Sequence, residues 1–576
     1  HDAERSGATA VAVPADLKRV WQAELGGKLS AVTVAEGKLF VASVETHTVH
    51  ALDAATGKSV WARTVGGRVD SPPTIHQGRA LFGSADGWVY CLRAADGALI
   101  WRFRVAPEER RLVAFDQLES AWPVPGSVLV QGDAAYCVAG RSMFLDGGIR
   151  LVKLDVRTGK KLSESVLDER DPETGENLQV HVKGLVMPMA MPDILSSDGK
   201  RVYMRSQVFD LDGKRARVAP GDLADQEGEE AHLFCQIGFL DDTWFHRSYW
   251  EYGKSAGGGY GSWYTTGRFA PSGRMLVFDD GKVYGYGRKP QFYCNNSVLE
   301  YELFAADRQP SNAAIKRVQA GTREINQRSA RKAADSSDWK LRSLFDREKL
   351  SAVNFQWNSD QPSLHVRAMV LAGGTIFVAG PPDVVDEHEA LRKPEDPAVS
   401  AKLEQQAAAL DGTLRARLWA VSAADGKPVA RYQIDAMPVF DGMAAAGGRL
   451  YFATTAGHVV CLGGDGTEPL RRADAEPAQV AWPDEAKEEP AGLIPPEVRK
   501  ESDFQRVIAA AVAESKMGYR VRGEADQQAG LALKKLPAPA KGKVILKGKM
   551  QVLDVDGRLI NGFIAFGDGP SDEKTV

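Results

Sequence analysis

The eleven residues from Ala51 to Trp61 read ALDAATGKSVW, and this string decides the fold. Nearly the same string, CLRAADGALIW, returns at Cys91–Trp101, so the turn glycines Gly57 and Gly97 lie 40 residues apart. In each copy an alternating strand ends at a turn where glycine supplies the positive φ, and a second strand with a tryptophan follows. This period is longer than the roughly 20–30 residues of many solenoid repeats, and it suits one four-stranded blade of a β-propeller.

Weaker copies of the string extend the repeat along most of the chain. Lys153–Gly159 reads KLDVRTG, and Trp419–Lys427 reads WAVSAADGK. The strand-like runs between the copies predict an all-β, eight-bladed propeller over residues 1–466, or seven blades if the fifth and sixth units merge. The eighth unit, 438–463, holds only three strands. An N-terminal strand at 18–24 is expected to complete it, which would remove an unpaired sheet edge.

The pattern A-L-D-x-x-T-G-x-x-x-W resembles the repeat of the quinoprotein-like, PQQ-binding-like β-propeller family. That family includes PQQ-dependent dehydrogenases and an outer-membrane assembly lipoprotein that has the same fold without a cofactor. The resemblance implies that the tryptophan of one blade stacks on the turn glycine of a neighbouring blade, where a Cβ would clash with the indole. Ser163 and Ala430 replace the tryptophan in two units, so we expect this contact to be incomplete. The residues in the structural positions of the repeat are Trp21, Trp61, Trp101, Gly57, Gly97, Gly159 and Gly426.

Composition argues against several classes of protein. Lys and Arg total 72 against 76 Asp and Glu, so the net charge of −4 provides no positive field for nucleic acid. No apolar run reaches the roughly 18–20 residues of a membrane helix. The cysteines form no C-x-x-C motif and no adjacent pair, so we expect no zinc, iron–sulfur or c-type haem site. The five cysteines are Cys91, Cys137, Cys235, Cys294 and Cys461.

Two polar, helix-permissive stretches interrupt the strand pattern. Residues 309–345 are rich in Arg, Lys and Ala, and residues 384–415 include a second helical run at 401–410. Both lie between predicted strands, so they predict helical insertions into the propeller.

The repeat stops at residue 467. The Glu-, Pro- and Ala-rich stretch 467–500 predicts a linker. Residues 501–576 are expected to hold a short amphipathic helix at 502–516 and then a β-rich segment. This tail resembles the start of a concanavalin-like or laminin-G-like sandwich and is too short to complete one. We therefore expect the chain to be part of a longer polypeptide.

Aromatic and charged side chains gather between residues 239 and 264. Rings stack on the C–H faces of sugars while charged groups bind the hydroxyls, so this segment is a candidate glycan-binding site. Its ligand-binding candidates are Trp244, Trp250, Asp241 and Asp242. His246, Arg247 and Tyr249 also have the composition of a polysaccharide lyase, in which Arg neutralises a uronate and His or Tyr moves a proton. The alternative interpretation is that the aromatic residues fill the core between blades.

Two further segments supply ligand-binding candidates. Arg141 and Asp146 lie in a long charged turn, 139–148, where we expect them to pair with each other or to face the central channel. His181 and Lys183 lie on one side of a predicted strand.

Taken together, the residues favour a binding or scaffold module within a larger protein, with a carbohydrate polymer or a protein as its partner. The alternative is an enzyme, either a polysaccharide lyase or a PQQ-dependent oxidoreductase. The family resemblance implies a periplasmic or secreted location. No cofactor is expected because the adjacent cysteines of PQQ dehydrogenases are absent, and PQQ with calcium is the alternative. Since fold does not establish function, the site must decide.

Overall fold

Strand β4 (Lys38–Ser43) shows why this sequence forms a ring. Leu39 and Val41 share an apolar cluster with strands from the end of the chain, whereas Phe40 and Ala42 share one with the following blade. Both faces of the sheet are therefore covered, and the strand reads as a continuous apolar run rather than an alternating one. Each blade is stabilised by its two neighbours, as in a closed propeller.

The computed structural model places the chain in two units, His1–Pro477 and Ala478–Val576. The structure describes residues 2–124, 128–171, 174–177, 192–204, 207–215, 231–235, 250–253, 267–290, 301–332, 345–359, 363–473, 505–507, 510–515, 518–523 and 531–533.

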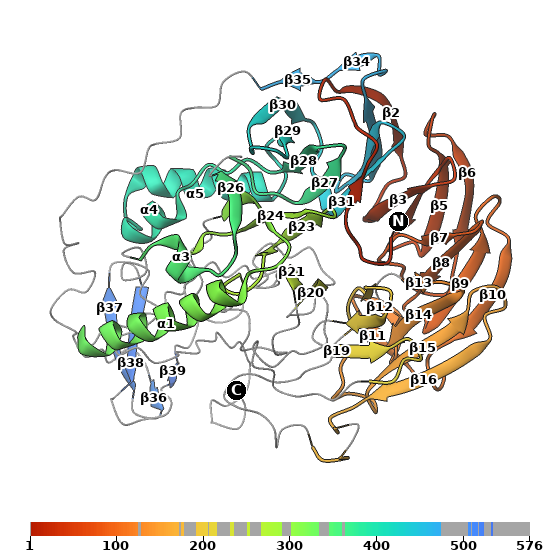
Figure 1. Cartoon of the computed structure of the whole chain (residues 1–576), viewed down its shortest axis with the longest axis horizontal. Helices are drawn as coiled ribbons and strands as arrows, with labels where there is room; N and C mark the ends of the chain where they lie inside the picture. The colour runs from red at the N-terminus through yellow and green to blue at the C-terminus, as the bar shows by residue number, and fades with distance from the viewer. Residues whose placement is uncertain are drawn as a thin grey trace. The chain divides into compact units, whose positions relative to one another are not determined.

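The first unit is the predicted eight-bladed β-propeller (Figure 1). Blade one comprises β3 (Leu29–Ala35), β4, β5 (Thr48–Asp53) and β6 (Ser59–Thr64). Blade two comprises β7 (Thr74–His76), β8 (Arg79–Gly83), β9 (Trp88–Arg93) and β10 (Leu99–Arg104). Blade three comprises β13 (Leu129–Gln131), β14 (Ala134–Ala139), β15 (Ile149–Asp155) and β16 (Lys161–Leu167).

The fourth and fifth blades have three strands each among the described residues. Blade four comprises β17 (Ser196–Ser197), β18 (Arg201–Met204) and β19 (Gln207–Asp210), and blade five β20 (His232–Cys235), β21 (Trp250–Gly253) and β22 (Ser272–Gly273). Blade six comprises β23 (Met275–Phe278), β24 (Lys282–Arg288), β25 (Tyr301–Asp307) and β26 (Phe355–Ser359). Blade seven comprises β27 (Ala368–Ala372), β28 (Thr375–Gly380), β29 (Ala416–Ser422) and β30 (Pro428–Ile434).

Blade eight joins the two ends of the propeller. It comprises β31 (Pro438–Ala446), β32 (Arg449–Thr454), β33 (His458–Gly463) and the N-terminal strand β2 (Lys18–Glu24). β2 pairs antiparallel with β33, with Trp21 opposite Cys461. Short strands extend this arrangement: β1 (Ala8–Thr9) pairs with β27, β34 (Glu468–Pro469) with β2, and β35 (Arg471–Arg472) with β30. A separate hairpin, β11 (Arg111–Ala114) and β12 (Gln117–Ser120), lies between blades two and three.

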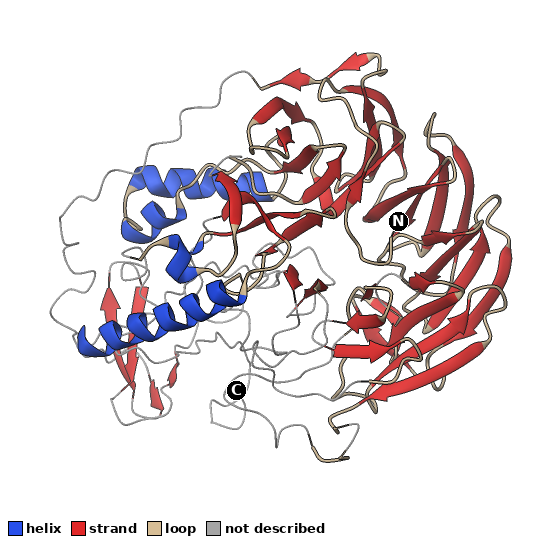
Figure 2. Ribbon diagram, in the orientation of Figure 1, coloured by secondary structure: helices blue, strands red, loops and turns tan. Residues whose placement is uncertain are grey.

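The expected helical insertions are present (Figure 2). α1 (Asn312–Lys332) and α3 (Arg347–Leu350) lie between β25 and β26, while α4 (Glu387–Arg392) and α5 (Pro397–Leu410) lie between β28 and β29. Asp386 and Asp396 cap α4 and α5 by accepting hydrogen bonds from backbone N–H groups of the first turn. Within the described part of the chain, no helix has the length and apolarity to cross a membrane.

Among the described residues, four blade junctions share one tryptophan contact. The indole N–H groups of Trp21, Trp61, Trp101 and Trp357 donate to the carbonyls of Ala54, Ala94, Val156 and Ala423, at 2.9–3.1 Å. Each acceptor lies three residues before a turn glycine of the next blade. A Cβ added to these glycines, Gly57, Gly97, Gly159 and Gly426, would lie only 2.6–2.8 Å from the indole. Trp357 is a member of this set that the repeat pattern did not reveal.

The channel of the ring contains the start of the chain. The carbonyls of Ala3, Ser6 and Gly7 accept hydrogen bonds from Ser197, Phe278 and Leu371, which belong to blades four, six and seven. The side chain of Arg5 donates to the carbonyl of Leu195 at 3.0 Å. One short segment thus connects the inner strands of three blades that are far apart in sequence.

The second unit corrects one prediction. In place of the helix expected at 502–516, the structure has strands β36 (Gln505–Val507) and β37 (Ala510–Ser515). β37 pairs with β38 (Gly518–Gly523), and β36 with β39 (Leu531–Leu533). The cross-strand hydrogen bonds outweigh the helix propensity of the Ala-rich run. The strands predicted beyond residue 543 lie outside the described residues.

Candidate interaction face and central channel

Hairpin β11–β12 is added to the connection between blades two and three. Its register places Leu112 opposite Glu119 and Val113 opposite Leu118. Because side chains alternate between the two faces of a strand, each of these pairs occupies its own face of the hairpin. Glu119 is buried, whereas Val113 and Leu118 are exposed. The hairpin therefore has one face toward the propeller and one toward solvent.

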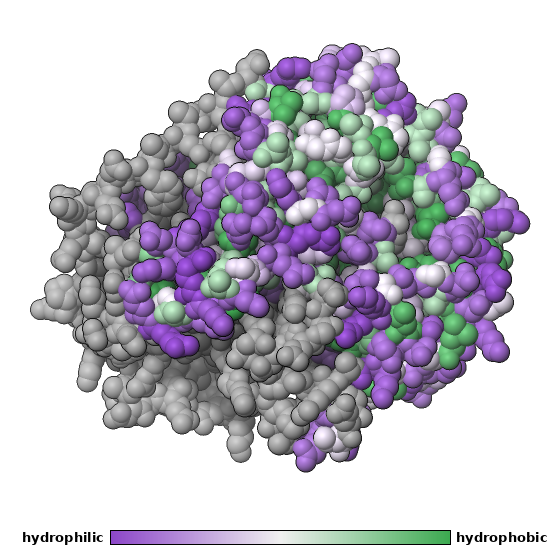
Figure 3. Space-filling view, in the orientation of Figure 1, coloured by the Kyte–Doolittle hydropathy of each residue, from purple (hydrophilic) through white to green (hydrophobic). Residues whose placement is uncertain are grey.

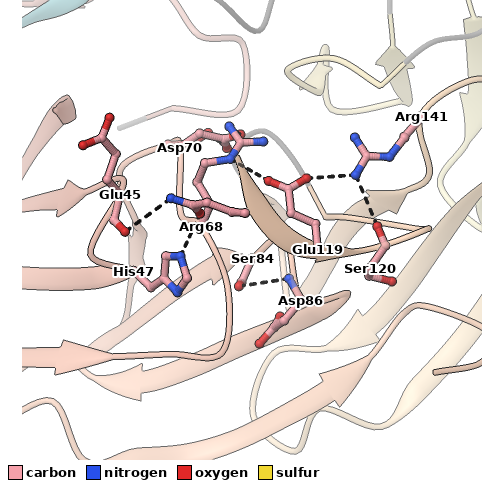
Figure 4. Close-up of polar contacts among 11 residues, drawn as sticks. Glu45, His47, Arg68, Asp70, Ser84, Asp86, Glu119, Ser120 and Arg141 are labelled. Carbon is pink, nitrogen blue, oxygen red and sulfur yellow. Dashed lines mark hydrogen bonds and ion pairs between the residues drawn. The ribbon is translucent and has the colours of Figure 1, made fainter. Parts of the chain in front are cut away.

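The inner face of the hairpin is fixed by the fully buried carboxylate of Glu119, which lies between two arginines (Figure 4). One carboxylate oxygen accepts from Nε of Arg68 at 2.9 Å, and the other from Nη2 of Arg141 at 2.8 Å. Arg141 also donates to the carbonyl of Ser120 at 3.3 Å, and Arg68 pairs with Asp70 at 3.2 Å. Breaking a buried pair leaves charges uncompensated, so these contacts hold the hairpin firmly against the propeller.

The tip of the hairpin contacts blade one. Phe115 and Asp116 have φ of 50° and 58°, the conformation of a two-residue type I′ turn. The turn places Gln117 where its Oε1 accepts a hydrogen bond from Nε2 of His47 at 2.8 Å. The guanidinium of Arg68 lies 4.4 Å from the ring centroid of Phe115. Side chains from blades one, two and three thus meet at this hairpin.

The outer face of the hairpin presents apolar side chains to solvent. Val113, Phe115 and Leu118 are 76%, 69% and 54% exposed, and the neighbouring loop exposes Phe144 and Leu145. We call these five residues the apolar hairpin surface. Figure 3 shows apolar side chains among hydrophilic ones over the described blades. Apolar side chains that are gathered on a surface mark sites of interaction more often than scattered ones do.

A further ion pair holds the loop 139–148 against the base of the hairpin. Arg110 pairs with Asp146, and its guanidinium lies 4.7 Å from the ring centroid of Trp122. The indole N–H of Trp122 donates to the carbonyl of Asp146 at 3.0 Å. The prediction that Arg141 pairs with Asp146 is wrong. Arg141 pairs with Glu119 of the hairpin, and Asp146 pairs with Arg110 at its base.

A cavity of about 400 Å³ lies at the centre of the ring, between the inner strands of blades one, six, seven and eight. Trp250 lies at its wall. Much of the remaining wall is aliphatic, with a few charged groups. The charged residues of the wall are Asp2, Arg5, Lys28, Arg68, Asp70 and Asp441.

Asp441 and Arg5 line this cavity, and the protein shifts the pKa of each. The surrounding protein disfavours ionisation and raises the pKa of Asp441 to about 6, an effect that the positive charge of Arg5 partly offsets. Burial lowers the pKa of Arg5 to about 10, against the effects of Asp2 and Asp441. The Asp441 side chain is exposed to the cavity, and the ring encloses it.

The structure describes only some of the predicted site residues. Arg141 and Asp146 lie at the hairpin, and Trp250 is the buried first residue of β21. The other candidates lie outside the described residues: Asp241, Asp242, Trp244, His246, Arg247, Tyr249, His181 and Lys183. The sequence interpretation missed the hairpin surface, although Val113, Phe115 and Leu118 interrupt the repeat at the place where a short blade connection was due.

The described channel does not reproduce a PQQ site. The sequence has no adjacent cysteine pair, and the N-terminal segment crosses the channel through hydrogen bonds to blades four, six and seven. Burial raises the pKa of the thiols of Cys91, Cys137 and Cys461 to about 12, so these buried side chains stay protonated and unreactive. We therefore derive no chemistry through such a cofactor.

Sequence comparisons match parts of the chain to known proteins. A family model described as "Outer membrane protein assembly factor BamB" matches residues 7–208, in accord with the predicted quinoprotein-like repeat. BamB of Burkholderia pseudomallei (strain K96243) is 32% identical over 143 residues, which is 25% of this chain and 33% of the relative. BamB of Moranella endobia (strain PCIT) is 37% identical over 79 residues, 14% of this chain and 19% of the relative. The matches thus span a third or less of these curated relatives.

Solved structures of two kinds share the propeller architecture. BamB from Moraxella catarrhalis has a TM-score of 0.40 at 12% identity, covering 78% of this chain and 99% of that one. Quinohemoprotein alcohol dehydrogenase from Comamonas testosteroni has a TM-score of 0.46 at 13% identity, covering 84% and 82%.

Proposed function

We propose that this propeller is a protein-binding scaffold module and that it binds its partner through the apolar hairpin surface. The observation that carries the proposal is the two-sided hairpin: Glu119 fixes its inner face by two ion pairs, while Val113 and Leu118 remain exposed on its outer face. The family model that matches residues 7–208 is described as an assembly factor, which supports a scaffold role.

The chemistry of the surface favours a protein partner over a sugar polymer. Sugar-binding clefts place aromatic rings beside convergent hydrogen-bonding groups. Here the central pair of side chains is aliphatic, Val113 with Leu118. Arginines beside the hairpin are paired with acids, Arg68 and Arg141 with Glu119 and Arg110 with Asp146. Aliphatic and aromatic side chains on a rigid support suit an apolar segment of another protein.

The location that fits this role is the periplasm. Two relatives of this chain are named for assembly of outer-membrane proteins, and a propeller of this kind would present its hairpin surface to a component of such machinery. A glycan partner or a lyase activity based on His246, Arg247 and Tyr249 remains a separate hypothesis, which rests on the sequence alone.

Photocrosslinking tests the proposal. A photoreactive amino acid at Phe115 in the full-length protein, in cells of the source organism, should give one specific adduct with an envelope protein. The matched control is Leu162, which is 52% exposed on the outer strand of blade three, away from the hairpin. Equal labelling at the two positions, or no adduct at Phe115, contradicts the proposal.

A pair of introduced charges then tests the surface with the purified partner. The double variant Val113→Asp/Leu118→Asp should weaken binding at least about 100-fold, because burying two carboxylates against an apolar partner is costly. Leu162→Asp/Val166→Asp, on exposed positions of β16, should bind like the wild type. Release of unsaturated uronate from glycans by the wild-type protein would instead favour the lyase hypothesis.

A further inference from the structure

A polar cluster lies where blade seven gives rise to its helical insertion. Strands β27 and β28 form a hairpin, and the segments that flank it continue the pairing. The N–H of His365 donates to the carbonyl of Pro381 at 2.9 Å, and the N–H of Asp383 donates to the carbonyl of Ser363 at 3.0 Å. Leu364 and Pro382 form the β-bridge between these contacts. The backbones of His365 and Asp383 are therefore held in register on neighbouring strands.

The helical insertion supplies the third residue of the cluster, Glu387, and its helix α5 fixes the loop that precedes Glu387. Gln406 of α5, almost fully buried, donates to the carbonyl of Pro382 at 3.1 Å and accepts from the N–H of Val384 at 2.8 Å. Glu387 is the first residue of α4, and the N-cap of that helix is made by Asp386, whose carboxylate accepts from the N–H of Glu389 at 2.7 Å. Both ends of the short loop are thus anchored.

The three side chains converge on one point. Nε2 of His365 lies 3.4 Å from Oδ1 of Asp383 and 4.0 Å from Oε1 of Glu387, and all three ligand atoms lie within 4.8 Å of one another. His365 is 1% exposed, while Asp383 and Glu387 are partly exposed, so the cluster has a buried end and an accessible end. Among the described residues, Oδ1 of Asp383 is buried and accepts no hydrogen bond.

A buried carboxylate oxygen without a hydrogen bond needs a compensating positive charge. A divalent ion bound at about 2.0–2.2 Å by imidazole nitrogen and carboxylate oxygen keeps its ligands roughly 3–4 Å apart, which matches the distances from His365. A small side-chain rotation would bring the two carboxylates into the same range. The donor set of one nitrogen and two oxygens suits a transition metal better than calcium or magnesium, which prefer oxygen alone.

We propose that His365, Asp383 and Glu387 form a binding site for a divalent transition-metal ion, zinc in the first instance. Three protein ligands leave the fourth tetrahedral position for water or for an exogenous ligand, and this position lies toward the exposed side of Asp383 and Glu387. The site joins β27, β28 and α4, so occupancy fastens the helical insertion to blade seven. It is independent of the apolar hairpin surface.

Calorimetry with Zn²⁺ on the full-length protein, freed of metal by chelation, tests the site. The wild type should bind one ion per chain at this site. Asp383→Asn and Glu387→Gln keep the side-chain shape and should each weaken binding more than about 10-fold, since even indirect partners of a metal contribute that much. Glu389→Gln, a charge change on the same helix, is the matched control and should bind like the wild type.

Two readouts separate metal binding from a structural ion pair. Without metal, the two variants should melt within a few degrees of the wild type, and added Zn²⁺ should raise the melting temperature of the wild type and of Glu389→Gln only. Co²⁺ should give a visible spectrum of nitrogen and oxygen ligation without thiolate bands, which excludes the cysteines as ligands. Absence of stoichiometric binding, or equal Zn²⁺ affinity in Asp383→Asn/Glu387→Gln, overturns the proposal.

Discussion

The junction between blades one and two differs from the junction between blades three and four. At the first, the indole of Trp61 lies on Gly97 and donates to the carbonyl of Ala94. At the second, Ser163 occupies the tryptophan position, and its hydroxyl donates to the carbonyl of Asp212. An indole covers far more apolar surface than a hydroxyl can, so the same ring is closed by junctions of unequal strength.

The turn on the far side of the second junction is also different. In blades one and two the N–H of the turn glycine bonds to a carbonyl four residues earlier, as from Gly57 to Asp53. In blade four, Gly213 bonds to Asp210, three residues earlier, so the turn is one residue shorter. The carbonyl that would accept the indole N–H is therefore missing from its usual position. Lys153 and Asp212 form a 3.0 Å ion pair there instead.

A third kind of junction joins blades seven and eight. Ala430 stands at the tryptophan position, and the N-terminal segment fills the gap: Val13 and Leu17 are buried in the cluster shared by the two blades. The hydroxyl of Tyr432 accepts from the N–H of Leu17 at 3.0 Å and donates to the carbonyl of Ala15 at 2.8 Å. A missing tryptophan contact is thus replaced by different residues at different junctions.

Among changes at the blade junctions, we expect Trp61→Ala to lower the stability of the fold most. Removing this buried indole should lower the free energy of unfolding by about 3–5 kcal/mol, because a large cavity opens between blades one and two. Chemical denaturation measures the loss. Trp88→Ala is the control: Trp88 is partly exposed and stacks on Arg102 within its own blade, so its removal should cost less. Equal losses would mean that the indole has no special role between blades.

Gly97→Ala tests the same junction from its other side. Gly97 has φ of 72°, and a Cβ would lie 2.8 Å from the indole of Trp61, so we expect a loss of about 2–4 kcal/mol from strain and overpacking. Gly78→Ala is the matched control, since Gly78 has φ of 73° with no atom within 4 Å of its Cβ position. It should lose only about 1–2 kcal/mol for the backbone conformation. Chemical denaturation of both variants measures the difference between their unfolding free energies, provided that the dependence on denaturant concentration has the same slope in both.

Ser163→Ala should have a smaller effect, at the junction without tryptophan. The variant removes one hydrogen bond, to Asp212, from a partly exposed site and should cost about 1 kcal/mol. The same denaturation experiment checks it beside Trp61→Ala. A loss as large as that of the tryptophan variant would show that hydroxyl contacts close the ring as strongly as indoles do.

The last predicted effect is a pH dependence at the junction of blades seven and eight. The N–H of Asp441 donates to the carbonyl of Arg367 across this junction, and enclosure raises the pKa of the Asp441 carboxyl to about 6. A raised carboxyl pKa favours the protonated form in the folded state. This stabilisation is complete below about pH 4 and is lost as the pH rises through about 6.

Asp441→Asn should therefore melt at a higher temperature than the wild type at pH 7, and the two should converge near pH 4. Melting curves between pH 4 and 8 measure the change, and Asp133→Asn, at an exposed turn, should leave the wild-type profile unaltered. A wild-type profile that is parallel to that of Asp441→Asn over this range would contradict the assignment.

The fold was more predictable than the site. The string ALDAATGKSVW and its copies predicted eight blades, because turn glycines and alternating strands act over a few residues. The repeat pattern did not reveal Trp357, because the helical insertion lies between it and its acceptor, Ala423. The two residues are 66 positions apart in the sequence, whereas Trp61 and Ala94 are 33 apart. The repeat period that revealed the other tryptophans is lost wherever an insertion intervenes.

The interaction face and the metal-ligand cluster could not be predicted in the same way. Glu119 meets Arg68 and Arg141 only because the ring brings blades two and three and the inserted hairpin together. The pairing expected for Arg141 within its own loop failed because a buried carboxylate from outside the loop was available. His365 and Glu387 likewise meet only after β27 and β28 have paired.

The amino-acid sequence by itself determined the blade: its strands, its glycine turns and the tryptophan positions follow from backbone geometry within about 40 residues. The tertiary structure alone decided which groups of different blades meet, and it placed the N-terminal segment in the channel. The physical reason is the sequence separation over which each kind of interaction acts. Turn and strand preferences are local, whereas ion pairs, ligand clusters and enclosed charges depend on closing a ring whose first and last strands are more than 400 residues apart.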